Sequence, residues 1–181
     1  MDIFDRVLEE HQKSLEEFKR KKEQIFKIYE ILNKALSGGN KILICGNGGS
    51  ASDASHMAAE LVGRFVKERK GLCAISLSTD TSILTSVSND YSFELVFARQ
   101  VEAIGKEGDV LVGFSTSGKS KNVIKAFETA KSMGIKTVGI LGSPGFIEKI
   151  SDASFTINGT TARVQEIHSI LIHILCEMIE K

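Results

Sequence analysis

Two side chains that could do chemistry, His56 and Glu60, lie four residues apart in a segment whose apolar spacing predicts a helix. Four residues advance a helix by about 40° beyond a full turn, so the imidazole and the carboxylate share one face. Both groups are common zinc ligands, and a carboxylate can also act as a general base. The spacing suits two ligands of one metal, although a solvent-exposed histidine and glutamate pair explains it better when it is taken alone.

A second group of polar side chains lies near the C-terminus, where residues 161–180 are predicted to form the last helix. Gln165 and His173 are about 80° apart around this helix, and His168 points about 140° away from His173. The helix also carries an apolar stripe that consists of Val164, Ile167, Leu171, Ile174, Leu175 and Met178. His173 therefore faces away from this stripe, toward solvent, a partly buried site or a subunit interface.

A glycine-rich segment, GNGGSA at residues 46–51, follows a short apolar run and opens a predicted helix. Its bare backbone N–H groups lie beside the positive end of a helix dipole, so an anion could dock there. A glycine turn without a ligand gives the same pattern, and so does the dinucleotide fingerprint G-x-G-x-x-A. That fingerprint needs an acidic residue about 20 residues further on. Asp80, the nearest candidate at a strand end, lies further away, which disfavours a dinucleotide.

A second polar loop, STSGKS at residues 115–120, follows the apolar run 110–114 and precedes an amphipathic segment. Hydroxyl groups, N–H groups and a helix dipole converge there, so this loop is the better phosphate site. A P-loop is excluded because the glycine that it requires, five residues before the Gly-Lys pair, would be Gly113, inside the predicted strand. A hydroxyl-rich helix cap without a ligand is the remaining alternative.

The elements that position these loops are short apolar runs alternating with amphipathic helices, a pattern typical of a parallel sheet covered on both faces. We predict a three-layer αβα sandwich, an α/β fold of flavodoxin type in one domain over residues 1–181. Its five parallel strands are expected at 41–45, 72–77, 109–113, 136–140 and 153–157. Its helices are expected at 50–66, 80–87, 92–105, 119–132, 144–150 and 161–180, after one or two helices within 5–36 that pack on a neighbouring subunit or on their own domain.

The composition excludes several classes of protein. Lys and Arg together number 23, as do Asp and Glu, so no overall charge draws the chain to nucleic acid or to an anionic membrane. No apolar run is long enough to span a bilayer, and the N-terminus lacks a signal-peptide pattern, so a cytoplasmic location is expected. The three cysteines are widely spaced, which argues against a disulfide framework, and Cys45 and Cys73 are expected in the core.

The order of these motifs along the chain resembles that of the phosphoheptose isomerases, a family within the sugar isomerase (SIS) domain superfamily. The matching residues run from Lys41 to Glu180, and each motif is weak alone while their order is specific. They are the glycine loop at 46–50, then Asp53, His56, Glu60 and Arg64, then Asn89-Asp90, the loop 115–120, and finally Thr161-Ala162-Arg163-Val164-Gln165-Glu166-Ile167-His168 with His173. The chain departs from the family at Thr160 and Ala162, where related sequences often place an aspartate.

The resemblance implies roles for individual residues, with Glu60 and His173 as the catalytic pair. It implies one Zn²⁺ per subunit, bound by His56, Glu60, Gln165 and His173. The substrate phosphate would be held by Ser115, Thr116, Ser117 and Ser120. The sugar would be contacted by Asn47, Gly48, Gly49, Ser50, Glu60, Asn89, Asp90 and Gln165.

The implied reaction converts sedoheptulose 7-phosphate to D-glycero-D-manno-heptose 7-phosphate through an enediolate, at the start of bacterial heptose synthesis for lipopolysaccharide or surface glycans. The implied assembly is a homotetramer with active sites at subunit interfaces. One rival is a non-catalytic adaptor of the same superfamily that binds a replication initiator, but such adaptors are altered at the positions that Glu60 and His173 occupy. A sugar-phosphate-sensing regulator would carry a DNA-binding segment, and none precedes Lys41.

Overall fold

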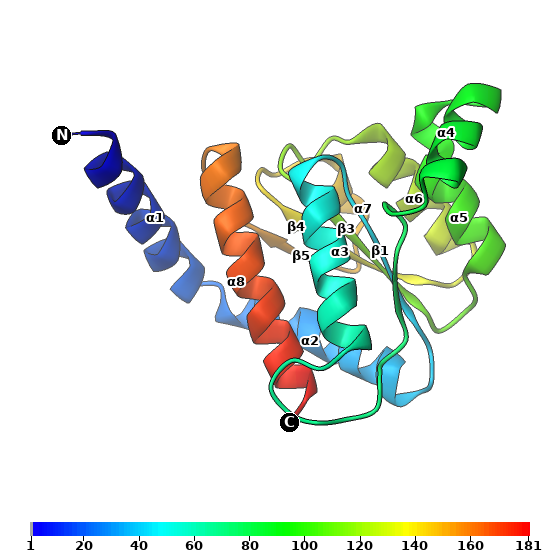
Figure 1. Cartoon of the computed structure of the whole chain (residues 1–181), viewed down its shortest axis with the longest axis horizontal. Coiled ribbons are helices and arrows are strands. Elements are labelled where there is room, and N and C mark those ends of the chain that lie inside the picture. Colours follow the sequence, from blue (N-terminus) through cyan, green and yellow to red (C-terminus); the bar gives the residue numbers. More distant parts are fainter. Residues whose placement is uncertain (1) are drawn as a thin grey trace.

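The computed structural model describes residues 2–181, which fold around a five-stranded parallel sheet with helices on both faces (Figure 1). The strand order is β2-β1-β3-β4-β5, so the chain reverses direction across the sheet after β2. The strands are β1 (Ile42–Cys45), β2 (Ala74–Ser76), β3 (Val110–Ser115), β4 (Lys136–Leu141) and β5 (Ala153–Thr156). The predicted αβα sandwich is confirmed.

The strands read as continuous apolar runs because both faces of the sheet are buried. In β1, Ile42 and Ile44 point into one core layer, whereas Leu43 and Cys45 point into the other, and all four side chains are fully buried. Adjacent residues of a strand face opposite sides, so each strand supplies both layers.

Four helices cover one face of the sheet, and the helices between β2 and β5 cover the other. The first set is α1 (Ile3–Lys19), α2 (Lys22–Ser37), α3 (Gly49–Val62) and α8 (Thr161–Ile179). The second set is α5 (Val96–Ile104), α6 (Lys121–Ser132) and α7 (Phe146–Ile150), with α4 (Thr81–Asp90) and the 3₁₀ turn η1 (Phe93–Leu95) beside them. Within residues 2–181, no helix is long and apolar enough to cross a membrane.

The N-terminal segment forms two helices that meet at Arg20 and Lys21. Helix α2 packs on the sheet, and the C-terminal end of α1 joins the same core layer through Phe18, whose ring lies 5.5 Å from that of Phe155 in β5. The rest of α1 extends along α8, and its N-terminal end projects from the molecule (Figure 1). Near its free end, Ile3 is 75% exposed and Phe4 is 70% exposed.

Several element boundaries differ from the predictions. Helix α3 ends at Val62 rather than at 66, because Gly63 follows and the backbone then turns into a loop over 63–73. Strand β2 begins at Ala74, so Cys73 lies in that loop and is exposed, and its expected place in the core was wrong. The helix predicted at 92–105 is divided into η1 and α5.

Candidate active site

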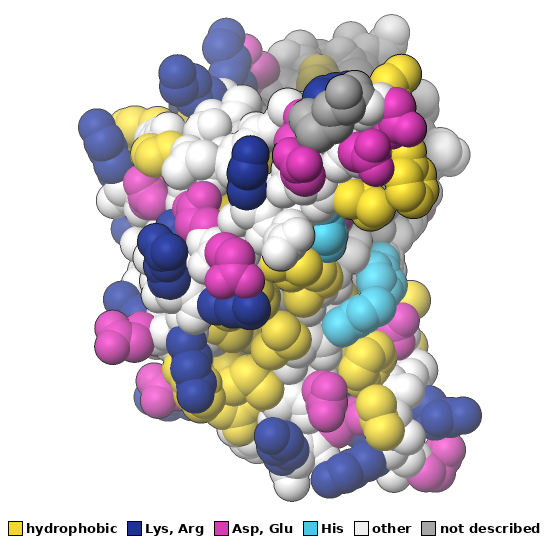
Figure 2. Space-filling view, turned by 90° about the vertical axis from the view of Figure 1, so that its left-hand side faces the viewer, with side chains coloured by type: hydrophobic (Ala, Val, Ile, Leu, Met, Phe, Trp, Pro, Cys, Tyr) yellow, Lys and Arg dark blue, Asp and Glu magenta, His cyan; other side chains and the backbone are white. Residues whose placement is uncertain are grey.

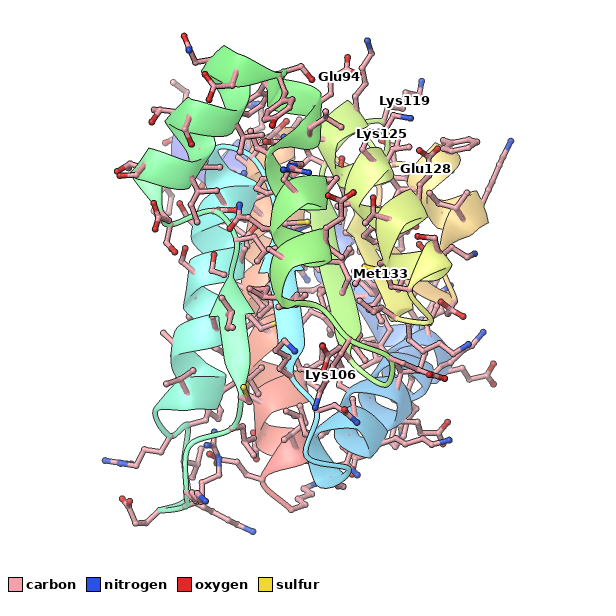
Figure 3. All side chains as sticks on the ribbon, turned by 90° about the vertical axis from the view of Figure 1, so that its right-hand side faces the viewer. Glu94, Lys106, Lys119, Lys125, Glu128 and Met133 are labelled. Carbon is pink, nitrogen blue, oxygen red and sulfur yellow. The ribbon has the colours of Figure 1, made fainter. Side chains whose placement is uncertain are left out.

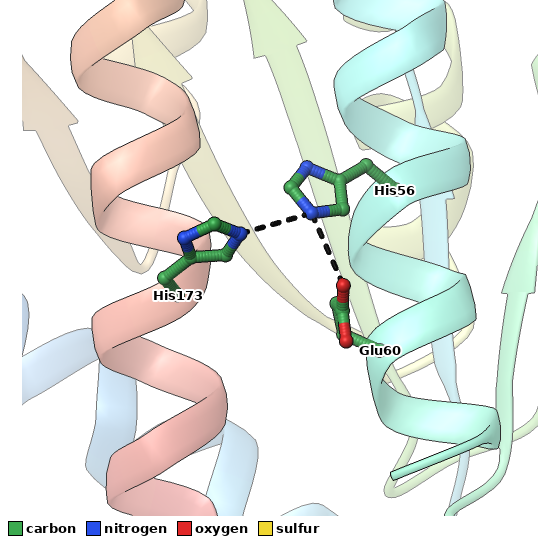
Figure 4. A group of neighbouring side chains, drawn as sticks. All are labelled: His56, Glu60 and His173. Carbon is green, nitrogen blue, oxygen red and sulfur yellow. Dashed lines mark hydrogen bonds and ion pairs between the residues drawn. The ribbon is translucent and has the colours of Figure 1, made fainter. Parts of the chain in front are cut away.

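Helices α3 and α8 bring together three polar side chains from opposite ends of the chain. His56 Nε2 lies 3.3 Å from Glu60 Oε1 and 3.1 Å from His173 Nε2 (Figure 4). All three ligand atoms lie within 4.8 Å of one another. The two residues on α3 are half-buried and His173 is exposed, so the group is open to a small molecule.

The spacing of these atoms fits a metal ion. Two ligand atoms at about 2.0–2.1 Å from a tetrahedral zinc lie roughly 3.4 Å apart, close to the observed separations. Two imidazoles and one carboxylate are also a donor set of catalytic zinc sites, which keep further positions for another ligand or substrate. A hydrogen bond between His56 and His173, in which one ring nitrogen donates to the other, explains the same separation without a metal.

Aromatic and apolar groups surround this cluster. The ring of Phe65 lies 5.2 Å from that of His173, and the two histidine rings are in edge contact at 4.9 Å. Figure 2 shows histidine side chains open at the surface of this face, flanked by hydrophobic side chains. Burial, reinforced by the Glu60 carboxylate, raises the pKa of the neighbouring Cys176 thiol to about 12, so this thiol is protonated at neutral pH.

Gln165 lies at the other end of the α3–α8 interface, where its side chain packs against Gly49. A Cβ atom at position 49 would fall 1.9 Å from Gln165 Nε2, so only glycine leaves room for this amide. Gly49 contacts Gln165 and His56 contacts His173, which shows that α3 and α8 run in the same direction. Gln165 precedes His173 by eight residues, or about 12 Å of helix. Its role as a metal ligand stays a prediction.

The glycine loop after β1 requires a conformation that only glycine adopts readily. Gly48 has φ +56° and ψ −123°, and a Cβ at Gly46 would lie 2.4 Å from the backbone oxygen of Ser50. The Ser50 N–H donates to Asn47 O at 3.0 Å, which closes the turn that starts α3.

Asn47 is held by a residue that the sequence did not single out, Asn122. Their side-chain amides exchange two hydrogen bonds of 2.8 and 2.9 Å, and Asn122 is buried in the first turn of α6. Since α6 starts directly after the loop 115–120, this amide pair links the two predicted ligand loops. In the sequence, the only sign of this role is an asparagine two residues after the loop, and asparagine is too common at helix starts to indicate a link between the loops.

The loop after β3 gathers the hydroxyl groups that were predicted to hold phosphate. Ser115 Oγ lies 2.8 Å from Ser120 Oγ and 3.5 Å from Ser117 Oγ. Ser120 is the N-cap of α6 but makes no side-chain cap bond, so its hydroxyl stays with the serine cluster. Lys119 is exposed at the same helix end (Figure 3), and its backbone N–H donates to Ser117 Oγ at 3.2 Å.

Tight glycine contacts hold this loop in place. Gly118 has φ +65°, and a Cβ there would lie 2.5 Å from Ser143 O. A Cβ at Gly142 would lie 2.5 Å from Thr116 O, so Thr116 is fixed against the loop after β4. The backbone here admits no larger residue without rearrangement.

Asn89 and Asp90 lie on α4, which is not one of the two helices that carry the histidine cluster. They end α4, both are exposed, and the Asn89 amide donates to Asp90 Oδ1 at 2.9 Å. In Figure 1, α4 lies at the opposite side of the molecule from α8. Directly after this pair the chain returns to the start of α6, where Lys121 Nζ donates to Glu94 Oε1 at 2.8 Å beside the loop 115–120.

Known proteins match this chain along its length. The model of the SIS domain matches residues 7–142. A phosphoheptose isomerase of Campylobacter jejuni subsp. jejuni serotype O:6 is 50% identical over 183 residues, which cover 100% of this chain and 98% of that protein. The chain belongs to the phosphoheptose isomerase family of SIS-domain proteins.

Solved structures of phosphoheptose isomerases agree with this assignment. The one from Neisseria gonorrhoeae superimposes with a TM-score of 0.88 at 39% identity and 99% coverage of both chains. The one from Francisella tularensis gives a TM-score of 0.91 at 31% identity and 100% coverage of both chains. The likeness of this SIS-domain chain to those enzymes therefore includes its N-terminal helices.

Proposed function

We propose that this chain is an aldose-ketose isomerase that converts sedoheptulose 7-phosphate to D-glycero-D-manno-heptose 7-phosphate. The observation that carries the proposal is the meeting of His56, Glu60 and His173 between α3 and α8. The reaction needs an acid, a base and a means to stabilise an oxyanion, and this group can supply them. Relatives named phosphoheptose isomerase at about half identity support the choice of substrate.

The metal of the proposed enzyme is Zn²⁺, held by His56, Glu60 and His173, with Gln165 as the fourth ligand. The ligand-atom separations of 3.1 and 3.3 Å support the first three. When bound there, zinc would polarise the sugar carbonyl as a Lewis acid and offset the negative charge of the enediolate oxygen.

The proton transfers are assigned to two side chains. The Glu60 carboxylate removes a proton from C1 of the open-chain ketose and returns it to C2. His173 takes the proton of the C1 hydroxyl and protonates the C2 oxygen. The net result moves one hydrogen between the carbons and one between the oxygens, so no oxidant or reductant is consumed.

The two loops bind the rest of the substrate in this proposal. Ser115, Thr116, Ser117 and Ser120 donate to the phosphate at the start of α6, where the helix dipole favours an anion. Asn47, Gly48, Gly49 and Ser50 contact the sugar, as does Gln165. The hydroxyl cluster and the Asn47–Asn122 amide pair support this division of roles.

The proposed assembly is a homotetramer of single SIS domains in the cytoplasm, with sites at subunit interfaces. The exposed apolar end of α1 supports a subunit contact. Helix α4, which carries Asn89 and Asp90, lies on the side of the molecule away from α8, and this supports a site that a neighbouring subunit completes (Figure 1).

The decisive assay follows sedoheptulose 7-phosphate by NMR with untreated, chelator-treated and zinc-reloaded protein. We expect conversion by the untreated protein, its loss on chelation and its return with zinc. Conversion that survives complete removal of metal would contradict the metal-assisted mechanism. Zinc-loaded, folded protein that converts no substrate would favour a non-catalytic adaptor or a different sugar phosphate.

A further inference from the structure

Glu180, the residue directly after α8, binds the loop that follows α3. Its carboxylate accepts hydrogen bonds from three successive backbone N–H groups, those of Phe65, Val66 and Lys67, at 2.8, 2.8 and 2.9 Å. Only 1% of the Glu180 side chain is exposed. Three N–H groups that converge on one carboxylate hold this loop to the end of α8.

Arg69 joins the same carboxylate to the end of α3. Its Nε donates to Glu180 Oε1 at 3.0 Å, and its terminal nitrogens donate to the backbone oxygens of Glu60, Leu61 and Gly63 at 2.9, 2.9 and 3.2 Å. Carbonyl groups in the last turn of a helix have no partner within the helix, and a cation there also complements the helix dipole. Arg69 therefore caps α3 through its side chain.

These contacts reach one member of the histidine cluster directly and a second one through Phe65. Arg69 binds the backbone oxygen of Glu60, the proposed base and metal ligand. Glu180 fixes the backbone of Phe65, whose ring lies against His173 at 5.2 Å. The helices that carry the cluster are thus tied together at their C-terminal ends.

We propose that Arg69 and Glu180 are positioning residues that set the distance between Glu60 and His173 and thereby the metal affinity and turnover of the site. Neither side chain touches the three ligand atoms, so both act through the backbone of α3 and the ring of Phe65. The part of this inference that concerns turnover depends on the proposed isomerase function. The part that concerns metal affinity depends only on the cluster.

The charge of Glu180 is maintained across the working range of pH. The backbone N–H groups, that of Lys67 foremost, together with Arg69, lower the pKa of Glu180 to about 2 against the opposing effect of burial. The carboxylate therefore remains ionised in any assay near neutral pH.

The test uses Glu180→Gln in the full-length protein, with Glu177→Gln as the control. Both changes remove one negative charge from the end of α8, but Glu177 is exposed and outside these contacts. Metal-free protein is titrated with Co²⁺, whose visible absorption reports the ligand geometry. We expect Glu180→Gln to weaken Co²⁺ binding by about tenfold or more, as loss of an outer-shell partner does in other metal sites, and Glu177→Gln to leave it unchanged.

Kinetics on the same proteins separate positioning from general stability. We expect a lower kcat for sedoheptulose 7-phosphate with little change in KM, measured well below each unfolding temperature. If Glu180→Gln does not fold, Arg69→Lys takes its place, because it keeps the charge but cannot make the forked contacts. A folded variant whose Co²⁺ affinity and kcat both equal those of the wild type would overturn the proposal.

The outcomes distinguish this inference from the proposed function. A wild type that binds Co²⁺ but converts no sedoheptulose 7-phosphate would contradict the proposed function. The Co²⁺ affinities of the wild type and the variants would still test the positioning role. A wild type that binds no Co²⁺ would overturn the positioning proposal together with the metal site.

Discussion

Glu60 has two proposed tasks, since the same carboxylate is assigned as metal ligand and as general base. A carboxylate bound to a cation is a weaker base, because the cation stabilises its ionised form. Glu60→Gln keeps the size and one possible ligand oxygen but cannot accept the carbon-bound proton. We expect kcat to fall by about 10²–10⁴ with sugar phosphate binding retained, measured by NMR turnover and by calorimetric titration.

The control for this change is again Glu177→Gln, which should keep full turnover. Unchanged turnover in Glu60→Gln would exclude Glu60 as the base and move that role to another group. Loss of both turnover and binding would instead indicate that Glu60 serves mainly to hold the metal and the substrate.

At the scale of elements, the interface between α3 and α8 contains a buried polar pair that has no hydrogen bond. His168 Nδ1 lies 3.8 Å from Asp53 Oδ2, and His168 is fully buried with its ring in edge contact with Phe114. Within residues 2–181, neither ring nitrogen of His168 nor Asp53 Oδ2 has a hydrogen-bond partner. A buried polar group without a partner is costly, so each of these side chains depends on the other for electrostatic compensation.

A double-mutant cycle tests this dependence. Asp53→Ala and His168→Leu should each lower the free energy of unfolding by about 1–3 kcal/mol, because each leaves the other group buried alone. The double variant should be more stable than the sum of the two changes predicts, by about 1 kcal/mol in urea denaturation. Strict additivity would show that the two side chains do not interact.

At the scale of the whole molecule, the apolar end of α1 is exposed within residues 2–181. Ile3, Phe4 and Leu8 are 75%, 70% and 53% exposed, which is unusual for large side chains on one helix end. We expect the wild type to be a tetramer by light scattering and the variant Phe4→Glu/Leu8→Glu to have a smaller mass. Turnover should fall with the mass, because the proposed sites lie at subunit interfaces.

The matched control is Ile104→Glu, which places a charge at an apolar residue, 40% exposed, at the end of α5. It should leave the mass unchanged. A wild type that is monomeric and fully active would contradict both the assembly and the shared site.

Much of the fold could be predicted because its signals are local. The buried strands read as apolar runs, and the loops 46–51 and 115–120 read as polar breaks at strand ends, where parallel sheets bind ligands. Helical spacing placed His56 and Glu60 on one face, and the structure confirms their contact. The prediction for Cys73 was wrong because the apolar run 72–77 is longer than the edge strand β2, which begins only at Ala74.

The sequence by itself determined the strands, the order of the helices and the two polar loops, since backbone preferences and apolar spacing act over a few residues. The tertiary structure alone decided that α8 lies along α3, which joins His173 to His56 across 117 positions of sequence. It likewise decided the contacts of Asn122, Arg69 and Glu180. The role of a polar side chain depends on the partner that packing places beside it, and the local sequence pattern does not identify that partner.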